Sequence, residues 1–141
     1  MGAGESSPLW GQILTAARRT ANSIDRSTIP SAPGVYAWFL DGECVYLGKA
    51  SNLRSRLRTH LATSLDLSRS TLRSWVAVRE LGLEREFTRR RPSGMSVEQV
   101  AVVNQWIRSC ELAWVVTPSK QEAAALESRL LAAWKPSINV A

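Results

Sequence analysis

The order of apolar and polar residues along the 141-residue chain predicts a mixed α/β domain. Two runs rich in strand-forming residues, 34–40 and 43–47, lie on either side of Asp41-Gly42, a dipeptide typical of a tight β-hairpin. A third run of this kind covers residues 112–116. We therefore expect a small, largely antiparallel sheet of three strands.

Apolar residues at helical spacing predict helices before, between and after these strands. The expected helices cover residues 9–25, 53–61, 69–80, 96–109 and 119–134. The last of them has the clearest beginning, because Ser119 followed by Glu122 matches a capping box. The fold class is then α/β (α+β), with a three-stranded sheet flanked by helices.

The length of the chain predicts one domain over residues 1–141, because it suffices for one hydrophobic core but not comfortably for two. Two segments add to the central pattern of strands and helices. Residues 1–29 are expected to form an N-terminal helical extension, and residues 62–109 a basic, helical insertion before the third strand. Within the insertion, residues 84–91 are a charged stretch closed by Pro92.

One charged residue lies on the apolar face of the last predicted helix. At about 100° per residue, Glu127 falls between Ala123 and Leu131 on the face that also carries Leu130 and Trp134. A carboxylate in such a place is costly unless it is paired or binds a cation. A buried ion pair with an arginine, a helix turned so that Glu127 reaches the rim, or a metal ligand would each account for it.

The distribution of charge along the chain indicates what kind of partner the protein binds. Residues 49–91 carry eleven Lys and Arg against four Asp and Glu, whereas the rest of the chain carries seven against eight. All of the net charge of +6 therefore comes from one middle segment. Such a basic segment is typical of a protein that binds a phosphate backbone, although a solvated arginine-rich surface has the same composition.

Several classes of protein are not expected. No apolar run approaches the roughly 20 residues that cross a bilayer. Residues 1–8 lack the basic and then apolar order of a secretory signal, so we expect a cytoplasmic protein. Cys44 and Cys110 are expected to be two small buried side chains, because they form no cluster of the kind that binds zinc or iron–sulfur groups.

The predicted hairpin carries two tripeptides that point to a specific chemistry, Gly-Val-Tyr at 34–36 and Tyr-Leu-Gly at 46–48. Five more residues match the same family in order: Lys49, Arg56, His60, Glu127 and Asn139. Together they resemble the GIY-YIG nuclease family, and most of all its excision-repair domains of the UvrC type. The resemblance covers residues 33–61 and 110–139, and in each tripeptide another aliphatic residue replaces isoleucine.

The resemblance implies a metal-dependent endonuclease that hydrolyses phosphodiester bonds in DNA. Glu127 would hold Mg²⁺ or Mn²⁺, which acts as a Lewis acid on the scissile phosphate. Arg56 would bind phosphate oxygens through its planar, permanently charged guanidinium. Tyr36 would orient or deprotonate the attacking water, and Tyr46 would bind the phosphate or that water through its hydroxyl.

The other matched residues have supporting roles. A phenol acts as a base only if nearby cations lower its pKa, and Lys49 and the metal are expected to do this for Tyr36. His60 lies on the same side of its helix as Arg56, so it either positions the tyrosine or the leaving group or packs in the core. Two glycines and an asparagine of the motifs are expected to support the site: Gly34, Gly48 and Asn139.

The length of the hairpin turn decides whether the two tyrosines can act together. A strict two-residue turn pairs residue 36 with 47 and places Tyr36 and Tyr46 on opposite faces of the sheet. A three-residue connection with a bulge pairs 36 with 48 and 38 with 46, which places both tyrosines on one face. We predict the longer connection.

DNA is the expected partner, with no membrane and no small-molecule cofactor. The expected DNA contacts are arginines in and before the insertion: Arg54, Arg58, Arg73, Arg89, Arg90 and Arg91. A catalytically silent nucleic-acid-binding module on the same fold is one alternative, but it predicts the loss of a motif residue and none is lost. A nuclease that acts on RNA is another, because recognition of the 2′-hydroxyl leaves no short motif.

Overall fold

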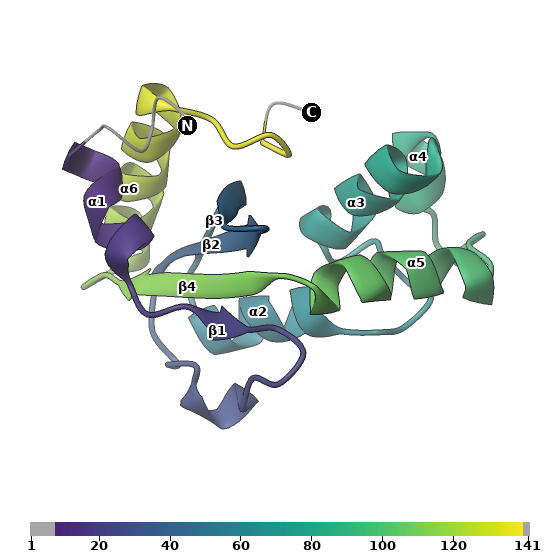
Figure 1. Cartoon of the computed structure of the whole chain (residues 1–141), viewed down its shortest axis with the longest axis horizontal. Helices are drawn as coiled ribbons and strands as arrows, with labels where there is room; N and C mark the ends of the chain where they lie inside the picture. Colours follow the sequence, from purple (N-terminus) through teal and green to yellow (C-terminus); the bar gives the residue numbers. More distant parts are fainter. Residues whose placement is uncertain (1–7, 140–141) are drawn as a thin grey trace.

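The computed structural model describes residues 8–139 and folds them around one antiparallel sheet (Figure 1). The prediction about a secretory signal therefore concerns residues that lie almost wholly outside the described part. The elements in chain order are α1 (Pro8–Thr15), β1 (Arg19–Thr20), η2 (Arg26–Thr28), β2 (Gly34–Leu40), β3 (Glu43–Ala50), α2 (Leu53–Leu61), α3 (Thr71–Leu81), α4 (Arg85–Thr88), α5 (Val97–Arg108), β4 (Glu111–Val116) and α6 (Lys120–Ala133). The α/β fold class is confirmed.

The sheet has four strands in the order β1-β4-β2-β3. The prediction of three strands is therefore wrong, because it lacks the short edge strand β1. The predicted helix over residues 9–25 ends at Thr15. Arg19 and Thr20 pair with Leu112 and Glu111 of β4 instead. Pairing with β4 provides hydrogen-bond partners for the backbone N–H and C=O groups of this segment. The helical spacing of the apolar residues does not indicate this pairing.

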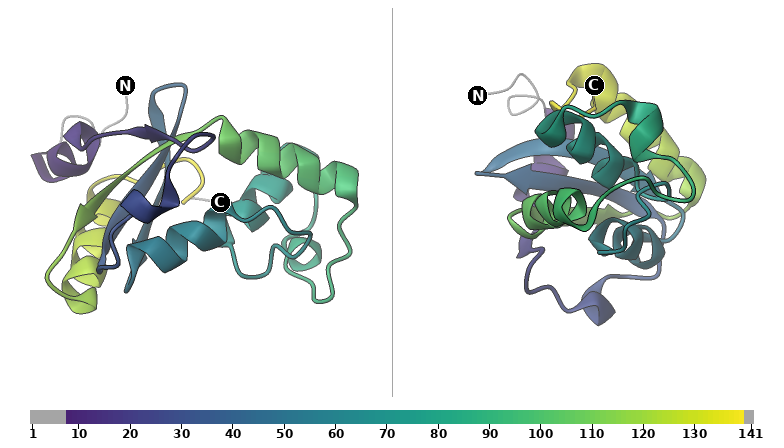
Figure 2. Two further views of the ribbon diagram at one scale, coloured as in Figure 1. Left: turned by 90° about the horizontal axis from the view of Figure 1, so that it is seen from below. Right: turned by 90° about the vertical axis from the view of Figure 1, so that its right-hand side faces the viewer.

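The two faces of the sheet pack against different helices (Figure 2, left). Val35, Ala37 and Phe39 point into a core with residues of α1 and α6. Tyr36 and Trp38 point to the opposite face, into a core with α2, α3 and α5. Because neighbouring residues of a strand alternate between faces, β2 separates these two cores residue by residue.

The two strands of the hairpin pair in the predicted register, but the turn between them is not the predicted one. Asp41 and Gly42 form a two-residue turn with φ values of 52° and 82°, as a type I′ turn requires, so the prediction of a longer connection is wrong. The predicted pairing is nevertheless confirmed, since Tyr36 pairs with Gly48 and Trp38 with Tyr46. The extra residue is a bulge at Val45, because Phe39 already pairs with Cys44.

The insertion over residues 62–109 is a helical layer that covers the Tyr36 face of the sheet. α3 begins after Ser70, whose hydroxyl accepts a hydrogen bond from the Arg73 backbone N–H, and ends at Gly82 with a φ of +66°. α5 packs against α3 and begins with a complete capping box of Ser96 and Gln99. The helices predicted over residues 69–80 and 96–109 are thus confirmed within one or two residues at each end.

Arg73 holds this layer together from within. Its side chain is only 1% exposed, and its guanidinium donates to the backbone carbonyls of Ser64 and Asp66 and to the side-chain oxygen of Asn104. Burial lowers the pKa of Arg73 to about 10. The prediction that Arg73 contacts DNA does not fit this arrangement, because its donors already tie the loop before α3 to α5.

Candidate active site

Two tyrosines and the histidine meet on the insertion side of the sheet. Tyr36 comes from β2 and Tyr46 from β3, and their ring centroids are 6.3 Å apart. The His60 ring, from the last turn of α2, lies 5.4 Å from Tyr36 and 6.3 Å from Tyr46 between ring centroids. The bulge at Val45 makes this possible, because it returns Tyr46 to the face of Tyr36.

Gly48 provides the space that Tyr36 occupies. A Cβ atom at Gly48 would overlap the ring and the hydroxyl of Tyr36, which pass directly over this residue. Gly34 is packed in the same way, because a Cβ there would overlap the Val115 carbonyl oxygen and the Leu53 side chain. Both motif glycines are thus explained by close approach rather than by backbone conformation.

A chain of buried hydrogen bonds leads from Tyr36 into the insertion. The Tyr36 hydroxyl lies 2.7 Å from His60 Nε2, and His60 Nδ1 lies 2.7 Å from the Ser70 hydroxyl. Tyr36 and Ser70 are each 2% exposed and His60 is 1% exposed. Ser70 belongs to no motif, so the sequence did not indicate it, although serine before a helix is a typical N-cap.

Burial sets the protonation of this group. Burial, together with the charges of Arg56 and Arg73, lowers the pKa of His60 to about 3, so the imidazole is neutral at neutral pH. Burial also raises the pKa of both tyrosines, and the negative charge of Glu127 adds to the rise. The charge of Arg56 opposes this rise at both hydroxyls.

Glu127 lies on α6 and is half-buried, as its place on the apolar face of that helix predicted. Burial raises the pKa of its carboxyl group, and Lys49 partly offsets the rise. The cation that acts on Tyr36 is Arg56, whereas Lys49 acts on Glu127. The expectation that Lys49 would lower the pKa of Tyr36 is therefore not met in this arrangement.

A hollow of about 390 Å³ opens beside these groups, between the end of β3, the start of α2 and the first turns of α6. It is lined by Lys49, Ala50, Ser51, Arg56, Lys120, Gln121 and Ala124. Three of its side chains are cationic and none is acidic, so it suits a phosphate group. Lys120 did not stand out in the sequence, because nothing local links it to Lys49 and Arg56.

Arg85 is a second cation that the sequence analysis missed. Its guanidinium lies over the Trp75 ring at 4.3 Å from the centroid and donates to the Ser74 hydroxyl. The positive charge of Arg85 opposes the burial-driven rise in the pKa of Tyr46. α4 thus brings one arginine of the insertion close to the hairpin that carries Tyr46.

Asn139 ties the C-terminal segment to the hairpin. Its side-chain oxygen accepts from the Leu47 backbone N–H at 2.8 Å, and its side-chain nitrogen donates to the Leu47 carbonyl at 2.9 Å. The Ile138 backbone N–H donates to the Val45 carbonyl at 2.9 Å. These bonds flank Tyr46 on both sides and hold the bulged part of β3.

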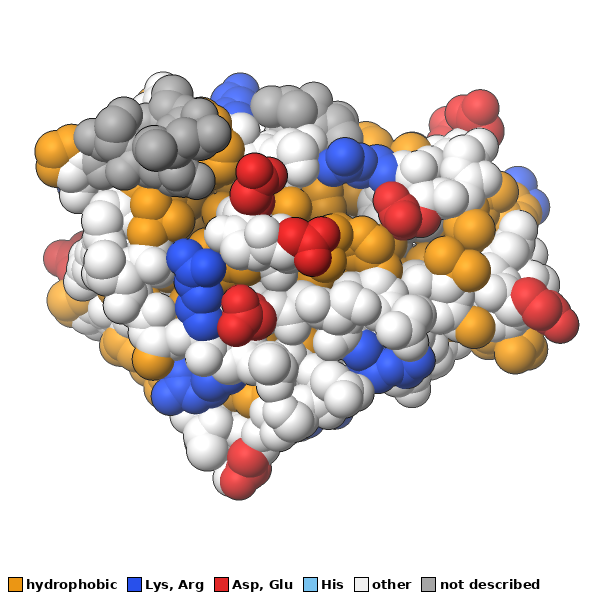
Figure 3. Space-filling view, in the orientation of Figure 1, with side chains coloured by type: hydrophobic (Ala, Val, Ile, Leu, Met, Phe, Trp, Pro, Cys, Tyr) orange, Lys and Arg blue, Asp and Glu red, His pale blue; other side chains and the backbone are white. Residues whose placement is uncertain are grey.

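The other predicted DNA contacts lie around the insertion. Arg58, Arg89, Arg90 and Arg91 are exposed, whereas Arg54 is half-buried and donates to the Ser27 and Ile29 carbonyls. A second hollow of about 290 Å³, lined in part by Arg58 and Arg69, lies next to Ser70. By contrast, acidic and basic side chains are mixed on the described part of the face drawn in Figure 3.

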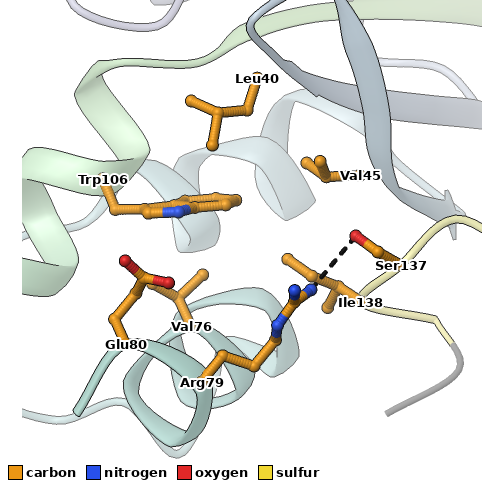
Figure 4. A pocket seen from close by; sticks show the side chains of 8 residues that line it. All are labelled: Leu40, Val45, Val76, Arg79, Glu80, Trp106, Ser137 and Ile138. Carbon is orange, nitrogen blue, oxygen red and sulfur yellow. Dashed lines mark hydrogen bonds between the residues drawn. The ribbon is translucent and has the colours of Figure 1, made fainter.

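A third hollow, of about 100 Å³, is chemically different (Figure 4). Its floor is apolar, with Leu40, Val45 and Trp106 facing one another, and Arg79 at its rim donates to the Ser137 hydroxyl at 3.2 Å. It has one arginine and no cluster of cations, so we assign it no part in the chemistry.

Together these groups define a nuclease domain. Hydrolysis of a phosphodiester needs an oriented water and compensation of the negative charge that develops on the phosphorane. A buried and a half-buried tyrosine, a half-buried carboxylate and an arginine in the wall of a basic hollow are suited to that task. Within residues 8–139, no three His, Cys, Asp or Glu side chains lie close enough to form a metal cluster. No helix in the same residues is both long and apolar enough to span a membrane.

Comparisons with known proteins identify the family. Residues 21–141 match the GIY-YIG catalytic domain, and the chain belongs to that family. It is 31% identical over 114 residues to UvrABC system protein C of Acidobacterium capsulatum, and 31% identical over 111 residues to the same protein of Aquifex aeolicus. The matched regions cover 80% and 79% of this chain but only 13% and 14% of these relatives.

A solved structure similar to this chain is the N-terminal GIY-YIG endonuclease domain of UvrC from Thermotoga maritima, bound to magnesium as its catalytic divalent cation. The identity is 22% and the TM-score 0.44, over 95% of this chain and 98% of that one.

Proposed function

We propose that this domain is a divalent-metal-dependent endonuclease that hydrolyses phosphodiester bonds in DNA. One observation carries the proposal: Tyr36 and Tyr46 meet from neighbouring strands with ring centroids 6.3 Å apart, and the charges of Arg56 and Glu127 act on both hydroxyls. Membership of the GIY-YIG family supports the reaction class. The similarity to UvrABC system protein C supports DNA as the substrate, DNA repair as the setting and the cytoplasm as the location.

The residues present fit a magnesium or manganese ion held by one carboxylate. Mg²⁺ is commonly bound through one or two carboxylates, and water and substrate phosphate oxygens complete its shell. Glu127 is half-buried with a raised pKa, and a cation beside it would favour its charged form. Such an ion would supply Lewis-acid polarisation of the scissile phosphate.

The side chains of the chain divide the remaining work. Arg56 binds phosphate oxygens from the wall of the basic hollow, where a guanidinium offers paired donors. The Tyr36 hydroxyl orients the attacking water through a hydrogen bond, and His60 holds that hydroxyl in place through its 2.7 Å hydrogen bond. Tyr46 binds the phosphate or the water from the neighbouring strand.

The surrounding cations provide the path for the DNA strand. Lys49, Arg56 and Lys120 line the basic hollow, and the charge of Arg56 also acts on both tyrosines. We propose that Arg58 and the exposed arginines 89–91 extend this path over the insertion of residues 62–109. In the same proposal the N-terminal extension, of which the structure describes residues 8–29, belongs to this one domain.

A cleavage assay on single-stranded, duplex, branched and plasmid DNA, with an RNA substrate in parallel, tests the proposal. Cleavage is expected with Mg²⁺ or Mn²⁺ and none with EDTA. Undiminished cleavage in EDTA would overturn the metal dependence, and preferential cleavage of RNA would overturn DNA as the substrate. Binding without cleavage on any substrate would show a silent binding module.

A further inference from the structure

Ser70 joins the insertion to His60. It is the last residue before α3, and its hydroxyl oxygen accepts from the Arg73 backbone N–H at 3.0 Å. The same oxygen lies 2.7 Å from His60 Nδ1, while His60 Nε2 lies 2.7 Å from the Tyr36 hydroxyl. Three polar side chains thus form one line, and each is at most 2% exposed.

The protons in this line can be placed in two ways. In the first, the Ser70 hydroxyl donates to Nδ1, and Nε2–H donates to the Tyr36 oxygen. In the second, Nδ1–H donates to the Ser70 oxygen, and the Tyr36 hydroxyl donates to Nε2. A neutral imidazole carries one N–H, and the low pKa of His60 keeps it neutral, so one of the two arrangements must hold.

The neighbours of Ser70 distinguish the two arrangements. Within the described residues, the Ser70 hydroxyl has two hydrogen-bond partners, the Arg73 N–H and His60 Nδ1. The Arg73 N–H can only donate, so Nδ1 is the acceptor available for the hydroxyl proton. In the second arrangement that proton would be buried without an acceptor, which is unfavourable. In the first arrangement the Tyr36 hydroxyl keeps an acceptor for its own proton, because it also forms a side-chain hydrogen bond with Tyr46.

We propose that Ser70 fixes neutral His60 as the Nε2–H tautomer, so that the imidazole donates a hydrogen bond to the Tyr36 hydroxyl oxygen. The catalytic meaning of this proposal rests on the proposed nuclease function. Nε2 already carries a proton, so His60 does not accept one from Tyr36. Instead it holds the tyrosine oxygen in place by donating a hydrogen bond to it.

Ser70 is then a positioning residue that links the insertion of residues 62–109 to the proposed active site. Ser70 caps α3, and α3 packs in the same core as Tyr36. The orientation of the imidazole therefore depends on where α3 begins. This coupling lies outside the sequence motifs of residues 33–61 and 110–139.

The chain has a single histidine, so ¹⁵N NMR of its imidazole nitrogens tests the tautomer without ambiguity. At pH 7 we expect a protonated Nε2 and an unprotonated, hydrogen-bonded Nδ1. A proton on Nδ1, or a doubly protonated ring, would overturn the proposal. This measurement needs no substrate, so it stands or fails independently of nuclease activity.

Two substitutions test the part played by Ser70. Ser70→Ala removes the hydroxyl, and Ser70→Gly removes it with less loss of helix capping. In both we expect the Nδ1 resonance to move toward that of a nitrogen without a hydrogen bond. Ser96→Ala removes the capping hydroxyl of α5 and serves as the matched control, with no expected change. Unchanged Nδ1 resonances in both Ser70 variants would contradict the assignment.

Kinetics test whether the tautomer matters for cleavage. We expect kcat to fall about tenfold in Ser70→Ala and Ser70→Gly with little change in KM, as for the loss of one buried hydrogen bond. Ser70→Thr, which keeps the hydroxyl, is expected to restore most of the rate. Wild-type kcat in the first two variants would refute the positioning role. If the wild-type domain cleaves nothing, the proposed function fails while the NMR result still decides the tautomer.

Discussion

The two faces of the sheet are both buried, yet they are built from different residues. The face of Val35, Ala37 and Phe39 packs against α1 and α6 with an almost wholly apolar set of side chains. The face of Tyr36 and Trp38 buries a histidine, an arginine and several hydroxyls among its apolar residues. One strand therefore supports an apolar core on one side and, on the other, a core with buried polar groups that carries the proposed active site.

Burying polar side chains costs stability, and the fold bears this cost on the face that carries the proposed active site. Buried polar groups need partners, and on the Tyr36 face the line from Tyr36 through His60 to Ser70 provides them. The apolar face still contributes one reactive group, because Glu127 lies on α6 at the edge of that core and its charge reaches both tyrosines. Substitutions on the two faces should therefore have separable effects.

The largest expected effect is the loss of the Tyr36 hydroxyl. Tyr36→Phe should lower kcat about 10²- to 10³-fold, because it removes the hydroxyl group that orients the attacking water. The matched control on the other face is Phe39→Leu, which should lower the free energy of unfolding and leave kcat unchanged. Single-turnover cleavage and urea unfolding measure the two effects, and equal kcat values for both variants would contradict the separation.

Gly48→Ala should also act on the reactive face alone. The added methyl group displaces the Tyr36 ring, and a displacement of about 1 Å costs about 10²-fold in rate. Gly11→Ala in α1 is the control, because nothing lies within 4 Å of a Cβ there. Cleavage rates at saturating metal check the prediction, and full activity of Gly48→Ala would be incompatible with the close packing described.

The neutral histidine should make stability depend on pH. The pKa of His60 falls from about 6.5 in the unfolded chain to about 3 in the fold, so the unfolded state binds the extra proton. Stability is then complete above about pH 6.5 and falls as the pH drops toward 3. Between pH 7 and 5 the free energy of unfolding should fall by about 2 kcal/mol.

Urea unfolding at pH 7 and pH 5 measures this loss. His60→Gln is the control, because it removes the titrating group and should show little change over the same interval. If the wild type were equally stable at both values, the imidazole could not be held neutral in the way its burial implies.

The smallest expected effect is on DNA binding, when a lysine is removed from the wall of the basic hollow. Lys120→Ala should weaken DNA binding and reduce the slope of log K against log salt by about 0.9, the effect of one phosphate contact on duplex DNA. Lys135→Ala, which removes an exposed lysine outside the hollow, should change neither as much. Salt titrations of binding check this, and equal slopes for the two variants would remove Lys120 from the DNA path.

Local patterns predicted most of the elements and the motif residues. The hairpin tripeptides indicated Tyr36 and Tyr46, and the apolar stripe of the last helix indicated Glu127. Each of these signals could be recognised because it lies within one short stretch of the chain. The bulge at Val45 was not predictable from alternation alone, since a shift placed in the turn gives the same pairing of Tyr36 with Gly48.

The remaining features depend on contacts between distant segments. Ser70 meets His60 and Arg85 comes near Tyr46 only after the insertion has packed on the sheet. Arg73 resembled the exposed arginines around it in sequence, but the fold buries it behind the loop of residues 64–66. A charge pattern identifies a basic segment and does not tell which of its members faces solvent.

The central claim is that one carboxylate, Glu127, makes this face of the sheet a metal-dependent nuclease. Single-turnover cleavage of plasmid DNA in Mg²⁺ by Glu127→Gln tests it most directly, with Glu122→Gln on the exposed side of the same helix as the control. We predict that Glu127→Gln abolishes measurable cleavage while still binding DNA, and that Glu122→Gln cleaves at close to the wild-type rate. Cleavage by Glu127→Gln at the rate of Glu122→Gln would contradict the account.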